Sequence, residues 1–388
     1  INLHLVCTAL LTHFVIAFFV LKTTIGQTIF SFIANLVINL YKAADKGIDF
    51  VFGPLSIVKV PSDFIFAVKV LPIIIFFGAV MSLLFHWGLI QRMVVAIGFL
   101  LKPILGTSGA ETLCAVANSF LGQTEAPLLV KNYIKGMTKS ELLVVMISGM
   151  GSISGAILAV FAGMGVPVRH LLAASVMSIP ASILIAKIIF PETQVPQTSC
   201  GAQVDFKSTS SNAIDAISSG TIDGLYLALN VGAMLIAFIA LIHVINNILG
   251  FASTQINNLF FYCNIDLNLP NLTLDTILGW ICLPFGWLLG FSGNEAFVAS
   301  QLIGTKIAVN ELVAYSKMVT MDLPSRTIAI ITYALCGFSN FSCIGIQIGG
   351  IGALAPEKRV WISEFGLRAV LGGALANLLS AMVASLLI

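Results

Sequence analysis

Apolar runs long enough to cross a lipid bilayer follow one another along almost the whole chain, and this feature constrains the fold more than any other. A membrane helix needs about 20 apolar residues. Of the 388 residues, 58% are hydrophobic and only 9% are charged, and the mean hydropathy is +1.02. A soluble domain would carry roughly 25% charged residues. The sequence therefore predicts an all-α polytopic membrane protein.

Seven segments meet the length criterion, and we expect each to form a transmembrane helix: 4–22, 64–86, 140–164, 169–190, 221–250, 326–350 and 360–388. Segments 27–46 and 88–105 are amphipathic and are expected to lie along the membrane interface. The chain starts with isoleucine and enters an apolar segment at once, so we expect a further N-terminal piece before it. Residues 1–22 lack the features of a cleavable signal peptide.

Two further apolar blocks, 109–136 and 273–308, are each interrupted in the middle by a polar pentapeptide that contains a glutamate, Glu125 or Glu295. Each half is too short to cross a membrane at about 1.5 Å per residue. We therefore predict two re-entrant helical hairpins, whose irregular tips must be buried against protein or water. A carboxylate at bilayer depth is costly unless it is paired, hydrated or used, so the two tips mark a candidate functional site.

The two blocks look like copies of one unit. A second glutamate follows each tip glutamate 16 residues later, Glu141 in the first copy and Glu311 in the second. Each block then leads into a span that is broken by small and polar residues, at 149–155 and at 337–345. The second copy has a longer connector, 313–325. The pattern predicts an internal repeat with two broken transmembrane helices, and coincidence within low-complexity apolar sequence is the alternative.

The repeat is predicted to be inverted. Three expected crossings separate the hairpins, and an odd number brings the second copy in from the opposite face. Lysines and arginines gather around the first hairpin, whereas 208–305 contains none. By the positive-inside rule the first hairpin opens to the cytoplasm and the second to the outside, with Arg169, Lys306 and Lys317 as exceptions. Inverted repeats with hairpins and broken helices are typical of secondary transporters.

The polar residues near the breaks are amides, hydroxyls and two carboxylates, without a concentration of Arg or Lys. Such a site favours a neutral solute with many hydrogen-bonding groups, because an anion would need cationic partners. Sugars, nucleobases and nucleosides fit best. The seven cysteines and five histidines show no metal-ligand spacing, no hydrolase or P-loop motif appears, and a net charge of +2 gives no nucleic-acid footprint. We therefore expect a protein that is not an enzyme.

Four motifs closely resemble the concentrative nucleoside transporter family: GQTEAPL at 122–128, SVMS at 175–178, PET at 191–193 and ALCGFSNFS at 334–342. The likeness runs from about residue 64 to the C-terminus. It implies a homotrimer in the cytoplasmic membrane, in which a scaffold surrounds mobile transport domains that carry nucleoside and sodium in an elevator movement. It also implies one more helix before the first expected span.

The repeat and the resemblance together divide the chain into four parts. Residues 1–108 would be scaffold helices with an interfacial helix, and 109–190 the first transport repeat with hairpin, broken helix and following helix. Residues 191–272 would be a connector, the long scaffold helix and an interfacial segment. The second transport repeat, with hairpin, broken helix and last helix, would be 273–388.

The resemblance also implies which residues form the site. Contacts to the nucleoside would come from both hairpins and both broken helices: Gln123, Thr124, Glu125, Ile157, Glu295, Phe338, Asn340 and Cys343. Sodium would be held by the side chains of Asn118 and Ser152 and by the backbone carbonyls of Leu121 and Ile153.

The chemistry of these side chains suits those roles. The amide of Gln123 both donates and accepts, so it can bond a base edge, and Glu295 can accept hydrogen bonds from ribose hydroxyls with Asn340 as its partner. Cys343 stands where many family members carry a ribose-binding serine, and a thiol donates only weakly. Structural roles compete with these: capping of the hairpin tip for Gln123, a helix cap for Asn118 and an interhelical amide for Asn340.

The predicted function is the sodium-coupled import of nucleosides of the uridine, cytidine and adenosine class, with the lipid bilayer as the protein's surroundings. One alternative is proton coupling, in which Glu125 would titrate. Another is a nucleoside-binding sensor or passive channel on the same fold.

Overall fold

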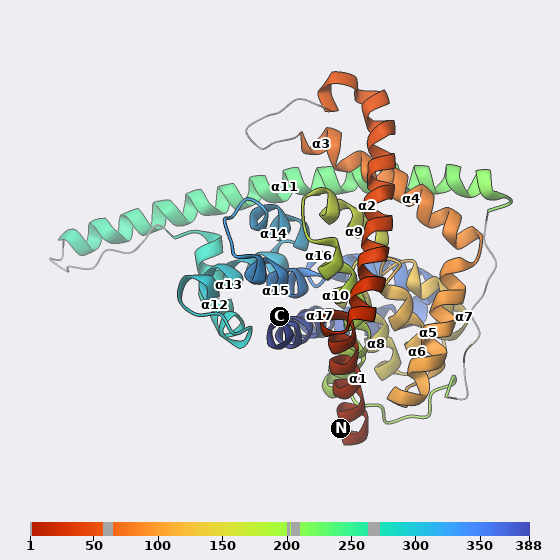
Figure 1. The fold of residues 1–388 in the computed structure, drawn as a ribbon. Helices are drawn as coiled ribbons and strands as arrows, with labels where there is room; N and C mark the ends of the chain where they lie inside the picture. Colours follow the sequence, from red (N-terminus) through yellow and green to blue (C-terminus); the bar gives the residue numbers. More distant parts are fainter. Residues whose placement is uncertain (1, 57–64, 200–201, 203–209, 263–271) are drawn as a thin grey trace.

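The computed structural model describes residues 2–388 except 57–64, 200–201, 203–209 and 263–271, and the regular secondary structure of this part is helical (Figure 1). Within it, seven helical segments are long and apolar enough to cross a membrane. They contain α1 (Leu3–Lys22), α2 (Thr24–Phe52), α3 and α4 (Phe66–Lys69 and Leu71–His86), α8 and α9 (Lys139–Gly151 and Gly155–Gly163), α10 (Val168–Ile189), α11 (Ala213–Tyr262) and α17 (Arg359–Leu387). Short 3-10 turns follow α2 at Gly53–Ser56 and precede α17 at Pro356–Lys358.

These helices agree with most of the expected spans, and they differ from the expectation at one span and at one interfacial segment. The span expected at 221–250 lies inside α11, which is 50 residues long. The segment 27–46, expected at the interface, lies inside α2, whose 29 residues are also long enough for a crossing. The other amphipathic segment forms α5 (Leu89–Leu105), with the bounds expected from its pattern.

The two hairpin blocks fold differently from each other. The second consists of α12 (Leu274–Leu288) and α13 (Gly293–Ala308), which are bent by 116° at the tip. The first has one regular arm, α6 (Gly109–Asn118), and its return arm contains only a 3-10 turn at Ala126–Val130 and the single-turn α7 (Lys131–Ile134). The second block is therefore a pair of regular α-helices, whereas the first returns through a short segment of 3-10 and then α geometry over residues 126–134.

The broken helices lie where the small and polar residues predicted them. The span expected at 326–350 is two helices, α15 (Ser325–Leu335) and α16 (Ser342–Leu354), and α8 and α9 are separated at Ser152–Ser154. One detail of the predicted repeat is wrong. Glu141 lies in the first turn of α8 itself, whereas Glu311 begins a separate helix, α14 (Glu311–Met318), inside the long connector. The equal spacing of the two glutamates is therefore not a structural correspondence, because α15 is the counterpart of α8.

The broken helices occupy the centre and α11 the periphery. In the most apolar stretch of α8 and α9, 94% of residues are buried, against 6% in α11. Helix α17 packs against α8, α10, α15 and α16, so it contacts both broken helices. Figure 1 shows α11 running across the molecule, with α12 and α13 toward one end and α5, α6 and α7 toward the other.

Glycines allow α11 to lie directly against α4. A Cβ at Gly220 would lie 2.5 Å from Ser82 Cβ and 2.6 Å from the carbonyl oxygen of Gly78. A Cβ at Gly224 would lie 2.8 Å from the carbonyl oxygen of Ile74. Small residues let membrane helices approach at backbone distance, which is a main source of their association.

This contact can be tested with two glycines of the same helix. We expect Gly220→Ala to destabilise the protein by about 1–3 kcal/mol, because the added methyl group overpacks the α4 contact. Gly250 has no atom within 4 Å of a built Cβ, so Gly250→Ala is the matched control and should be neutral or stabilising. Thermal unfolding of the purified protein in detergent compares them, and equal midpoints would contradict the proposed contact.

Candidate functional site

The first helix break is surrounded by buried polar side chains. Ser152 Oγ donates to the carbonyl oxygens of Asn118 at 2.7 Å and Ser148 at 2.8 Å. Asn118 Nδ2 donates to Ser148 Oγ at 2.8 Å. Ser154 then caps α9 by accepting from the backbone N–H of Ile157 at 3.4 Å. The break is therefore bonded directly to the last residue of α6 in the first hairpin.

Asn118 leaves one strong acceptor unused. Its side chain is 1% exposed, and its Oδ1 accepts no hydrogen bond from any residue that the structure describes. Leu121 and Ile153, whose carbonyls are expected to complete a cation site, are both buried. Leu121 follows Asn118 by three residues, and Ile153 follows Ser152, which bonds to Asn118. A buried oxygen without a donor is suited to a small hard cation, because such ions take oxygen ligands. The residues present therefore fit sodium.

The tip of the first hairpin is held by the second broken helix. Gln123 Nε2 donates to Cys343 Sγ at 3.2 Å, and Gln347 Nε2 donates to Gln123 Oε1 at 3.2 Å and to the carbonyl oxygen of Met146 at 2.9 Å. Gln347 Oε1 is buried and has no donor in the described part of the chain. The two amides thus link α8, α16 and the tip, with one acceptor still available.

The other two polar residues of this tip, Thr124 and Glu125, are both exposed, whereas Gln123 is buried. A Glu125 carboxylate oxygen accepts from the backbone N–H of Gly122 at 2.5 Å, so Glu125 also closes the turn of the tip. This is the structural role that competes with a contact to the nucleobase.

Asn340 lies in the second helix break with a fixed orientation. Its Oδ1 accepts from the backbone N–H of Cys343 at 3.1 Å and from Ser342 Oγ at 2.6 Å. Its Nδ2 donates to Glu311 Oε2 at 3.1 Å. Because a backbone N–H can only donate, the amide cannot be flipped. One N–H of Asn340 has no acceptor among the described residues and is available to a ligand.

Glu295 is a predicted site residue whose carboxylate has no partner among the residues that the structure describes. It lies half-buried in the first turn of α13, and the structure of the described residues gives it neither a hydrogen bond nor an ion pair. No hydrogen bond therefore joins it to Asn340 among these residues. Ile157 belongs to the same apolar cluster as Phe291 and Ala296, which lie at the second tip. Half-buried Phe338 packs against this cluster and also against the apolar cluster that contains Leu121 and Ala126 of the first tip.

The structure thus connects the predicted residues in two groups. Hydrogen bonds connect the first tip, the first break and α16. Glu295 lies at the second tip, and Ile157 belongs to the large apolar cluster that also contains Phe291 and Ala296. The backbone N–H of Phe338 donates to the carbonyl oxygen of Ser152 at 3.2 Å, which joins the two breaks. Among the described residues, no hydrogen bond joins Glu295 to Gln123, whose amide bonds to Cys343 and Gln347.

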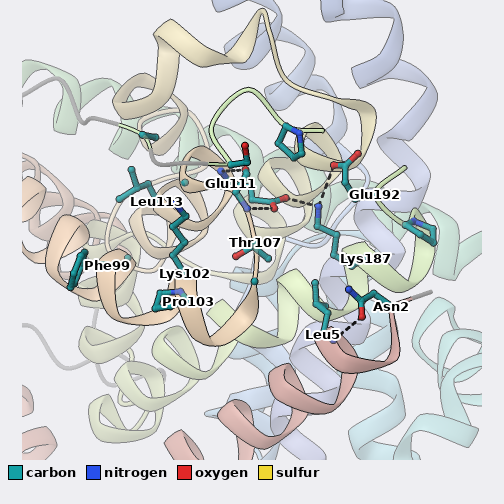
Figure 2. A pocket seen from close by; sticks show the side chains of 18 of the residues that line it. Asn2, Leu5, Phe99, Lys102, Pro103, Thr107, Glu111, Leu113, Lys187 and Glu192 are labelled. Carbon is teal, nitrogen blue, oxygen red and sulfur yellow. Dashed lines mark hydrogen bonds and ion pairs between the residues drawn. The ribbon is translucent and has the colours of Figure 1, made fainter. Parts of the chain in front are cut away.

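A cavity with a volume of about 1130 Å³ lies elsewhere, between α1, α5, α6 and the chain after α10 (Figure 2). None of the predicted site residues lines its described walls. Three of its charged groups are already paired, since Lys187 Nζ lies 2.7 Å from Glu111 Oε2 and 3.6 Å from Glu192 Oε2. We therefore place the candidate site at the helix breaks, where polar atoms lack partners, and not in this cavity.

Comparison with known proteins shows the family of the chain. The family described as "Na+ dependent nucleoside transporter C-terminus" matches residues 170–385, the corresponding N-terminal family matches 1–55, and a family described as "Nucleoside recognition" matches 67–168. The chain belongs to the concentrative nucleoside transporter family.

Relatives and solved structures match over nearly the full length. The chain is 44% identical to an uncharacterized transporter of Haemophilus influenzae and 37% identical to the nucleoside permease NupC of Helicobacter pylori, in each case over 100% of this chain and 92% of the relative. The structure of CNTnw in an inward-facing substrate-bound state has 39% identity and a TM-score of 0.91, over 100% of this chain and 93% of that one.

Membership establishes a multi-pass membrane protein of a nucleoside transport family, and not an enzyme, as the sequence predicted. Sequence reasoning missed several buried polar residues around the breaks: Lys306, Glu311, Gln347 and Asn377. Glu311 was identified only as part of the repeat. A signal existed for Lys306, because a lysine inside an apolar hairpin arm violated the positive-inside rule.

Two glycines test whether the first tip must contact α8 closely. A Cβ at Gly149 would lie 2.9 Å from Gln123 Cβ and 3.1 Å from Gln347 Nε2, so Gly149→Ala should displace the tip amide. We expect nucleoside affinity to fall about tenfold, as for loss of one well-placed hydrogen bond. Gly345→Ala is the control, since a Cβ there has nothing within 4 Å. Binding of labelled uridine measures both, and equal affinities would refute the close contact as a requirement.

Proposed function

We propose that this protein imports nucleosides by symport with sodium. The observation that carries the proposal is the buried, unpartnered Oδ1 of Asn118 beside Ser152, within a family whose matching description is sodium-dependent nucleoside transport. Sodium at this point would bridge the first hairpin and the first helix break. Asn118 lies only five residues before Gln123, so the ion would order the tip that carries the predicted nucleobase contacts.

The nucleoside would lie between the two tips. Gln123 and Thr124 bond the base, with Glu125 beside them, and Ile157 and Phe338 pack against its apolar faces. Glu295 accepts from ribose hydroxyls, and the free N–H of Asn340 donates to a hydroxyl oxygen. The support for this arrangement is the set of unused groups: the second N–H of Asn340, the Oε1 of Gln347 and the unpaired carboxylate of Glu295.

Cys343 replaces the family's serine in this arrangement. Its thiol accepts a hydrogen bond from Gln123 Nε2 at 3.2 Å and is 3% exposed. We propose that it positions Gln123 and contributes little to ribose binding, because a thiol is a weak donor.

We base the proposed division into a transport domain and a scaffold on the burial of the helices. The buried repeats 109–190 and 273–388 would form the transport domain of an elevator, and 1–108 with α11 from 191–272 would form the scaffold. α11 is apolar and 6% buried in its most apolar stretch, and its exposed face is the proposed contact between subunits of a homotrimer in the cytoplasmic membrane. Bacterial relatives support that location.

Ion replacement tests the coupling. In proteoliposomes with a sodium gradient we expect concentrative uridine uptake, and replacing sodium by choline at fixed pH should abolish it. Asn118→Leu should have the same effect in sodium, because it removes the free acceptor oxygen. Undiminished uptake in choline would exclude sodium coupling and favour a proton-coupled symporter in which Glu125 titrates. Binding without accumulation under any imposed gradient would indicate a sensor or a passive channel.

A substitution at the second tip tests substrate recognition. Glu295→Ala should abolish concentrative uptake of uridine and adenosine, since it removes the proposed acceptor for ribose hydroxyls. Asn294→Ala, at the exposed neighbouring residue, is the control and should retain uptake. Wild-type uptake by the Glu295 variant in the same vesicles would refute the role of this carboxylate.

A further inference from the structure

One side chain of α17 is bonded to both helix breaks. Asn377 Nδ2 donates to the carbonyl oxygen of Gly151 at 2.7 Å and to the carbonyl oxygen of Cys336 at 2.8 Å. Gly151 is the last residue of α8, and Cys336 caps the end of α15. Asn377 is 1% exposed. A single buried amide therefore satisfies one carbonyl at the end of each broken helix, where intrahelical donors have run out.

A buried lysine fixes the orientation of that amide. Lys306 Nζ donates to Asn377 Oδ1 at 2.6 Å and to the carbonyl oxygen of Ala334 at 2.9 Å, and Lys306 is 1% exposed. An ammonium group can only donate, so Oδ1 must face Lys306 and both N–H groups must face the helix ends. The positive charge also lies at the C-terminal end of α15, where the helix dipole favours a cation.

The two breaks are in contact on either side of this amide. The backbone N–H of Phe338 donates to the carbonyl oxygen of Ser152 at 3.2 Å. A Cβ at Gly337 would collide with Asn377 Oδ1 and lie 2.8 Å from the carbonyl oxygen of Met150. The end of α8 therefore cannot shift without disturbing residues 336–338.

We propose that Asn377 is a positioning residue that couples ion binding at the first break to nucleoside binding at the second. The inference rests on the proposed function, in which Ser152 binds sodium and Phe338 and Asn340 contact the nucleoside. An ion at Asn118 and Ser152 fixes the end of α8. Asn377 then holds the end of α15 against it, which orders the segment that leads to Asn340. By linkage, the nucleoside raises the affinity for sodium by the same factor.

Coupling through Asn377 is separate from the effect by which the ion would order the first tip. The tip lies in the same hairpin as Asn118, whereas Asn377 carries the effect to the second broken helix, at the opposite side of the substrate. Loss of the amide should therefore uncouple the ion from the ribose side while the ligands of both sites remain in place.

The test uses a substitution that preserves shape. Asn377→Asp keeps an oxygen for Lys306 but loses both N–H donors and turns an oxygen toward the carbonyls of Gly151 and Cys336. Calorimetry on the full chain in lipid nanodiscs would give the dissociation constant of uridine in sodium and in choline, and their ratio is the coupling factor. Ser380→Ala is the control on the same helix, because in the described part of the chain Ser380 Oγ bonds only to the carbonyl oxygen of Ala376 in its own helix, at 3.1 Å.

We expect a wild-type coupling factor in the range of about 5 to 150, a factor within about twofold of unity for Asn377→Asp, and the wild-type factor for Ser380→Ala. A folded Asn377→Asp protein with the wild-type factor would overturn the inference. If that variant does not fold, Gly337→Ala keeps the amide but forces the breaks apart, and an undiminished factor there would overturn it equally. A wild-type factor of one would refute sodium coupling itself, so failure of the proposed function is distinguishable from failure of this route.

Discussion

Backbone groups at the end of a helix inside a membrane protein must find partners within the protein, and this constraint organises the centre of the molecule. Helices α8 and α15 both end there, so their last carbonyls lack intrahelical donors. Side chains supply the donors: Ser152 to Ser148 at 2.8 Å, Asn377 to Gly151 at 2.7 Å, Tyr315 to Thr332 at 2.8 Å and Lys306 to Ala334 at 2.9 Å. Polar residues in this core are therefore needed first for the backbone, and the binding chemistry is built around them.

The two breaks satisfy this constraint in different ways. At the second break, the ammonium of Lys306 provides a fixed positive charge against the end of α15. At the first break, Asn118 Oδ1 is left without a donor among the described residues, and no lysine or arginine fills the gap there. The free oxygen of Asn118 gives a diffusible cation a reason to bind at the first break. This asymmetry agrees with the sodium site proposed at Asn118.

Local features of the sequence predicted most of the architecture, because apolar length, small-residue interruptions and tip carboxylates are each visible within about 20 residues. The sequence could not predict that Glu311 begins a separate helix. Glu311 follows its tip glutamate at the same distance as Glu141 follows Glu125, which suggested equivalent positions, but the longer connector of the second copy breaks that equivalence. The sequence also could not predict the partners of the site. Gln123 bonds to Gln347, 224 residues away, and such pairs follow only from the packing of distant helices.

Burial alone selects other carboxylates than the two at the hairpin tips. Glu111 and Glu141 are 1% exposed and Glu311 is 6% exposed, whereas Glu125 is exposed and Glu295 is half-buried. Each deeply buried carboxylate has internal partners: Glu111 with Lys187 at 2.7 Å, Glu141 with Ser108 Oγ at 2.5 Å and Glu311 with Asn340 at 3.1 Å. Ionised groups persist in a low-dielectric interior only when paired in this way. A carboxylate that the described fold leaves unpaired beside a half-buried tip, as at Glu295, therefore has its accepting capacity free for the hydroxyl groups of a substrate.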